Sequence, residues 1–140
     1  MRKVTGGLAL LCVFICWFVI GCSPPLTPVR TEVEAPALAR VQLITIEDNI
    51  FKFVVYNLSD QPMVILRDEV VLVTPSGPRH RLPGGLESTY DVAPGEHHAV
   101  NTRFDLDNIQ TGDTLEVDFS PAVQIGGKPT SIPKLPIRVD

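Results

Sequence analysis

Cys22, which follows a short uncharged stretch, is the reactive side chain whose surroundings are most informative about the chain. Thirteen uncharged residues, Leu8 to Ile20, come before the Gly21-Cys22 pair, and Arg2 and Lys3 come before that stretch. A basic start, a short apolar run and a small residue near its end are typical of a secretory signal peptide. The run is shorter than the about 20 apolar residues that a membrane span needs. The sequence therefore predicts an exported protein.

The residues Val19-Ile20-Gly21-Cys22 resemble the lipobox of bacterial lipoproteins. The resemblance implies cleavage between Gly21 and Cys22, a diacylglyceryl thioether on the Cys22 thiol and a third acyl chain on its amine. Each buried methylene contributes about 0.8 kcal/mol, so two or three chains anchor a protein to a membrane almost permanently. An uncleaved N-terminal anchor and an ordinary signal peptide that contains a cysteine are the alternatives. In Gram-negative lipoproteins a serine after the acylated cysteine, here Ser23, implies transfer to the outer membrane.

The other two cysteines, Cys12 and Cys16, lie inside the apolar run and would be removed with the signal peptide. The mature chain would then keep only an acylated Cys22. We therefore expect no disulfide, although an exported protein enters compartments that permit them. A cysteine nucleophile and a cysteine metal site are excluded for the same reason.

Histidines and carboxylates give no recognised catalytic or metal motif. His97 and His98 are neighbours, and neighbours on a strand point to opposite faces, so these two would not bind one ion together in the simplest geometry. A metal site formed by His80, one of these two histidines and a carboxylate is the alternative. Asp105 and Asp107 alternate as calcium ligands often do, but no calcium-loop pattern surrounds them or Asp113. We expect solvated histidines and an acidic loop with capping roles. The serines at turns lack a neighbouring His-Asp pattern: Ser59, Ser76, Ser88 and Ser120. The sequence predicts no enzyme and no cofactor.

Arg79, His80 and Arg81 form the one basic cluster of an otherwise acidic domain. One interpretation is a solvated edge strand, where charges discourage pairing between sheets. The other is a docking surface for an acidic partner or a glycan, because loops on a rigid scaffold often carry recognition. We take these three residues as the candidate partner-binding site and expect them at the surface.

The net charge of the chain limits the classes of partner that it could bind. The chain has 12 basic and 16 acidic residues, and removal of Arg2 and Lys3 leaves 10 basic residues and a formal charge of −6. That charge argues against nucleic acid and against charge-driven adhesion to anionic lipid. The 118 residues after Cys22 are enough for one domain.

The sequence predicts three segments: a signal peptide over 1–21, a tether over 22–39 and a folded domain over 40–140. The tether prediction depends on Pro24, Pro25, Pro28 and Pro36. Proline favours an extended chain of about 3.1 Å per residue, so the tether could hold the domain about 50 Å from the membrane.

From Arg40 onward the hydrophobic period is two. Leu115, Val117 and Phe119 alternate with Glu116 and Asp118, which is typical of a half-buried strand. Further strand candidates are 41–45, 51–56, 63–66, 70–73, 98–104 and 135–139, and residues 105–110 could form one helical turn. Proline, glycine, asparagine and aspartate separate these runs. The pattern predicts an all-β fold, an antiparallel sandwich of about seven or eight strands.

The spacing Phe51-x-Phe53-x-Val55-x-Asn57, with Pro94-Gly95-Glu96 and Phe104 later, resembles small immunoglobulin-like lipoprotein domains of bacteria, including a telokin-like group. The resemblance covers residues 40–119 and implies a fold and an envelope setting, with no established activity.

Three classes of function follow. The first is a membrane-anchored, non-catalytic interaction module that binds another envelope protein. The second is an accessory subunit of an envelope assembly, and the third is an enzyme. The absence of a catalytic motif favours the first.

Overall fold

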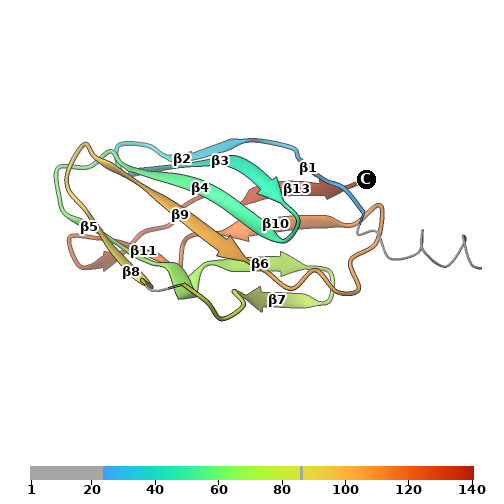
Figure 1. Ribbon diagram of the computed structural model, residues 1–140. Helices are drawn as coiled ribbons and strands as arrows, with labels where there is room; N and C mark the ends of the chain where they lie inside the picture. Colours follow the sequence, from blue (N-terminus) through green and yellow to red (C-terminus); the bar gives the residue numbers. More distant parts are fainter. Residues whose placement is uncertain (1–23, 86) are drawn as a thin grey trace, which may run out of the picture.

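A computed structural model describes residues 24–85 and 87–140, and Gly21 and Cys22 therefore lie outside the described residues. The described chain folds into β-strands that form two packed layers (Figure 1). One layer is a four-stranded antiparallel sheet of order β2-β3-β4-β9. Its strands are β2 (Glu32–Ala35), β3 (Ala39–Glu47), β4 (Ile50–Asn57) and β9 (His97–Arg103).

The second layer contains two further antiparallel sheets, of order β1-β13-β10-β6-β7 and β12-β11-β5-β8. The strands of the first are β1 (Leu26–Pro28), β13 (Leu135–Val139), β10 (Thr114–Asp118), β6 (Val71–Thr74) and β7 (Gly77–His80). The strands of the second are β12 (Lys128–Pro129), β11 (Val123–Ile125), β5 (Met63–Leu66) and β8 (Thr89–Val92). One 3₁₀ turn, η1 (Arg67–Glu69), joins β5 to β6.

The hairpin of β3 and β4 shows why the sequence forms strands. Phe51, Phe53 and Val55 are buried, and the residues between them are half-buried, so side chains alternate between the two faces of β4. Asp48 closes the hairpin with a left-handed φ of 56°, a conformation that aspartate tolerates better than most residues. The register shifts beside Ile44, which is 51% exposed.

Aromatic rings join the two layers in the core. Phe53 on β4 meets Phe119, which follows β10, with ring centroids 4.9 Å apart and ring planes at 78°. Phe51 meets Phe104 in the same edge-to-face manner, at 5.3 Å and 87°. All four rings are buried. Such pairs add about 0.5–1.5 kcal/mol to the burial of their area. The prediction of an all-β antiparallel sandwich is confirmed, whereas its immunoglobulin-like character stays a prediction.

The predicted tether is wrong from Leu26 onward, because the structure places this segment inside the fold. Strand β1 pairs with β13, with Leu26 opposite Val139, and β2 pairs with β3. Val33 and Ala35 alternate with glutamates and are 6% exposed each. This alternation covers only four residues, and the prolines before and after it, Pro28 and Pro36, favoured the prediction of an extended tether instead. The folded domain therefore begins near Leu26, and not at Arg40.

The described residues form thirteen strands, more than the seven or eight predicted. The additional ones are two to four residues long and have weak patterns: β1, β2, β7, β8, β11 and β12. Residues 105–110 form turns without a helix, and Asn108 adopts a φ of 63°. Among residues 24–85 and 87–140, no helix is long and apolar enough to span a membrane.

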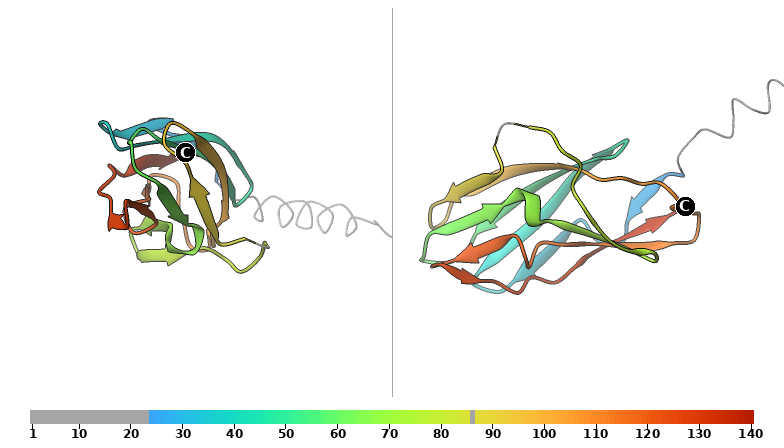
Figure 2. Two further views of the ribbon diagram at one scale, coloured as in Figure 1. Left: turned by 90° about the vertical axis from the view of Figure 1, so that its left-hand side faces the viewer. Right: turned by 90° about the horizontal axis from the view of Figure 1, so that it is seen from below.

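The two ends of the described chain lie side by side. The backbone N–H of Asp140 donates to the carbonyl of Pro25 at 2.9 Å, and β1 lies along β13 (Figure 2). The chain therefore enters and leaves the domain at one end, and a hollow of about 730 Å³ opens there. Its lining includes Pro24, Pro25, Asp48, Asp105 and Asp107.

Candidate functional site

Arg79, His80 and Arg81 do not form one surface. They run along β7 and just past it, and β7 is an edge strand that pairs with β6, as one of the two interpretations expected. Arg79 donates through Nη1 to the Asp105 carbonyl at 2.7 Å and through Nη2 to the Ser76 hydroxyl at 3.2 Å. His80 is exposed.

The expectation that the whole cluster faces solvent is wrong for Arg81. Its side chain is 14% exposed and forms an ion pair with Asp68 of η1. Its Nη1 donates to the carbonyl of Gly84 at 2.6 Å and to that of Leu82 at 3.4 Å. Arg81 therefore holds the loop after β7 against η1.

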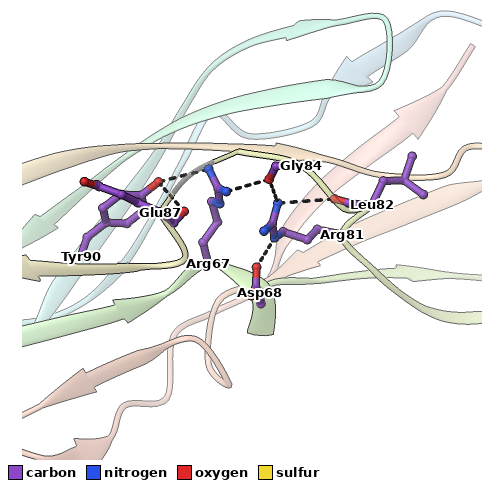
Figure 3. A network of polar contacts seen from close by, with 7 residues as sticks. All are labelled: Arg67, Asp68, Arg81, Leu82, Gly84, Glu87 and Tyr90. Carbon is purple, nitrogen blue, oxygen red and sulfur yellow. Dashed lines mark hydrogen bonds and ion pairs between the residues drawn. The ribbon is translucent and has the colours of Figure 1, made fainter.

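A second arginine, Arg67 of η1, meets Arg81 at the same oxygen (Figure 3). Arg67 is 8% exposed. Its Nη2 donates to the Gly84 carbonyl at 3.0 Å and its Nη1 to the Tyr90 hydroxyl at 3.2 Å. Both acceptors are neutral, and none of the ion pairs among the described residues includes Arg67. The guanidinium charge is thus buried without a carboxylate.

These two arginines line one wall of a cleft of about 370 Å³, which we call the arginine cleft. The opposite wall is part of the edge strand β9, with Asn101, Thr102 and Arg103. The full lining is Ile50, Arg67, Arg81, Leu82, Pro83, Gly84, Gly85, Asn101, Thr102 and Arg103. The Arg103 carbonyl accepts from Leu82 N–H at 2.7 Å, so its own N–H points to the same, outer side of the strand.

The arginine cleft carries an excess of positive charge. Three arginines line it, and Asp68 is the one described carboxylate that forms an ion pair with any of them. Two positive charges therefore remain, in a chain whose formal charge is −4. Two buried atoms of the lining residues also lack a hydrogen-bond partner, Arg67 Nε and Thr102 Oγ1. Buried polar groups without partners are rare in proteins, and an ordered water, an ion or a functional role can account for them.

Gly85 explains how the loop reaches Arg67. A Cβ atom at this position would lie 2.4 Å from Arg67 Nη2, so a side chain here would require the guanidinium group to shift. Gly85 also has a φ of 86°, a conformation that residues with a side chain rarely adopt. Pro83, Gly84 and Gly85 are residue types that are typical of a turn, and nothing in their sequence indicates that the turn covers Arg67.

The remaining candidates have structural roles. The ring centroids of His97 and Tyr56 are 5.2 Å apart, and the His98 ring stacks on the Tyr90 ring with centroids 4.2 Å apart. Asp105 accepts from Asp107 N–H at 2.9 Å, in agreement with the expected capping. No group of three or more metal-ligating side chains occurs in the described part of the chain.

The comparisons with known proteins give a fold and no family. Neither a protein-family model nor a curated protein matches the sequence. The crystal structure of ycdA from Bacillus subtilis is similar, with a TM-score of 0.57, 14% identity and 79% of this chain covered. The chain spans 39% of the length of that protein, whose description as a lipoprotein is itself provisional. At this identity the similarity shows the sandwich fold alone.

Proposed function

We propose that the protein is a lipoprotein of the bacterial cell envelope, anchored through acyl chains on Cys22, and that its β-sandwich acts there as a non-catalytic interaction module. In a Gram-negative cell, Ser23 after the acylated cysteine favours the outer membrane. The partner that we propose is another envelope protein. The description of ycdA as a lipoprotein agrees with this setting.

One observation carries the proposal. Strand β1 begins at Leu26, so only Ser23, Pro24 and Pro25 separate it from Cys22. Three residues span at most about 10 Å. An acyl anchor on Cys22 would hold the sandwich next to the bilayer, where it could bind a partner at the membrane surface.

The contacts of the serine hydroxyls support a role without catalysis. Ser59 Oγ accepts from the Gln61 N–H at 3.2 Å, and Ser120 Oγ donates to the Ile132 carbonyl at 2.9 Å. Both hydroxyls tie turns to neighbouring backbone, which is the ordinary role of serine at such positions.

Anchoring is tested by fractionation and intact-mass analysis of the full chain expressed in bacteria. We expect the mature protein to begin at Cys22, to carry acyl chains and to sediment with membranes. Cys22→Ala should abolish acylation and cleavage at this point, whereas Cys16→Ala should leave both intact. An unmodified Cys22 or cleavage elsewhere would contradict the proposal.

Binding is tested with a photo-crosslinking amino acid at His80, on the exposed edge strand β7. The same group at Ile44, which is 51% exposed on the other layer, is the control. We expect a discrete adduct with an envelope protein from position 80 and none from position 44. Equal adducts at both positions, or hydrolytic turnover by the purified protein, would contradict an interaction module.

A further inference from the structure

The arginine cleft has a buried cation that the described protein does not neutralise. Arg67 is 8% exposed and hydrogen-bonds to Gly84 and Tyr90 alone through its terminal nitrogens. Removing a charge from water is costly unless an opposite charge compensates for it. The free energy of this arrangement would fall if an anion occupied the space beside Arg67.

The residues around Arg67 add further positive charge that an anion would compensate. Arg81 directs its own guanidinium group to the same Gly84 carbonyl, so two like charges converge on one oxygen. Asp68 compensates Arg81 only. Across the cleft, Arg103 is exposed and makes no side-chain hydrogen bond or ion pair with the described residues. Three arginines from η1, the loop after β7 and β9 thus line one space.

We infer that the arginine cleft binds a phosphate group. A phosphate monoester carries a charge of about −1.5 to −2 at pH 7, which matches the two uncompensated positive charges of the cleft. Guanidinium groups and phosphate oxygens pair in fork-like geometry, and such charge-assisted bonds are about twice as strong as neutral ones. The outward N–H of Arg103 adds a backbone donor. The volume of about 370 Å³ leaves room for the group that bears the phosphate.

The site is independent of the lipid anchor. It lies wholly within the described sandwich and needs no residue before Ile50. Failure of acylation at Cys22 would therefore leave phosphate binding unchanged, and failure of phosphate binding would leave the anchor and its partner untouched.

The test is isothermal titration calorimetry with inorganic phosphate, against sodium chloride of equal ionic strength. The protein is used as the cell produces it, purified in a non-ionic detergent. We expect saturable binding with one phosphate per chain. Arg103→Gln should weaken it about tenfold, because a charge-assisted contact is lost while no described internal bond of the side chain is broken.

Arg30→Gln is the matched control. Arg30 is exposed, lies outside the lining of the cleft and carries the same charge. It should change the affinity by less than about twofold, because exposed charges far from a site are screened by salt. Equal weakening in both variants would show non-specific attraction, and no saturable binding to the unmodified protein would also overturn the inference.

A phosphate monoester can come from a soluble metabolite or from a lipid headgroup. Glycerol 3-phosphate represents the first source, and a short-chain phosphatidic acid represents the second. Tighter binding of the lipid would indicate a headgroup site at the membrane surface, and tighter binding of glycerol 3-phosphate would indicate a soluble ligand. Glycerol without the phosphate should not bind, and its binding would contradict recognition through the phosphate.

Discussion

Phe53 and Phe119 meet edge to face across the two layers, with their ring centroids 4.9 Å apart and both side chains 1% exposed. Phe53 lies on β4 of one layer and Phe119 directly follows β10 of the other, so their contact helps to hold the two layers together. Phe53→Ala should lower the free energy of unfolding by about 3–5 kcal/mol, through lost burial and the cavity left behind.

The adjacent Lys52→Ala is the control for Phe53→Ala in chemical denaturation. Lys52 points to the other face of β4 and forms only a surface ion pair with Glu47 at 3.0 Å. Its loss should change stability by less than about 1 kcal/mol. Similar losses at the two positions would contradict the alternation of faces along β4.

Thr102→Val should increase the stability of the ligand-free protein. The Thr102 hydroxyl is buried and has no hydrogen-bond partner, and an unsatisfied buried polar group is destabilising by about 1–3 kcal/mol. Valine keeps the β-branched shape and removes the hydroxyl. Denaturation midpoints check this expectation, with Thr45→Val at an exposed position of β3 as a control that should change little. A destabilised Thr102→Val protein would mean that the hydroxyl has a partner in solution.

Val33→Asp tests whether the segment before Arg40 belongs to the fold. Val33 is 6% exposed and sits opposite Val41 in the β2–β3 pair. A carboxylate buried there without a partner should be destabilising by several kcal/mol, enough to unfold a domain of ordinary stability. Glu34→Gln, on the exposed face, should cost little. Equal tolerance in circular dichroism melts would restore the tether as the better description.

The Asp140 carboxyl should respond to pH through Arg138. A hydrogen bond from Arg138, with a second from Thr27, holds the pKa of Asp140 below its ordinary value. Because the folded pKa is the lower one, the contact stabilises the fold above the unfolded pKa and is lost as the pH falls through the folded pKa. NMR titration should show a higher Asp140 pKa in Arg138→Gln and no change in Lys134→Gln. An unchanged Asp140 pKa in the Arg138→Gln protein would contradict this contact.

The part of the fold that alternation encodes could be predicted from the sequence. Leu115 and Val117 are buried and Glu116 between them is not, so the period of two was sufficient for β10. Strands β1 and β12 could not be found this way, because each is short, contains proline and is recruited by backbone pairing to a longer neighbour. Their positions depend on the sheet around them, which local patterns do not describe.

The arginine cleft could not be predicted from the sequence, for a similar reason. Arg67 stands next to Asp68 and Glu69, and such a run of charged residues is typical of an exposed turn. It is buried because a loop containing Gly84 and Gly85 folds back over it. The basic cluster singled out from the sequence includes Arg81, which is one of the three arginines of the cleft. Arg79 of the same cluster contacts Asp105 instead.

The adjacency of Pro25 and Asp140 has a consequence for how the chain order could be rearranged. Since the two ends hydrogen-bond to one another, a few glycines should join them without strain, and new ends could be opened in the exposed turn at Ser76. Such a circular permutant should keep the sandwich and its cleft. It would also move any lipid attachment from the end formed by β1 and β13 to the β6–β7 turn, and so present a different side of the domain to the bilayer.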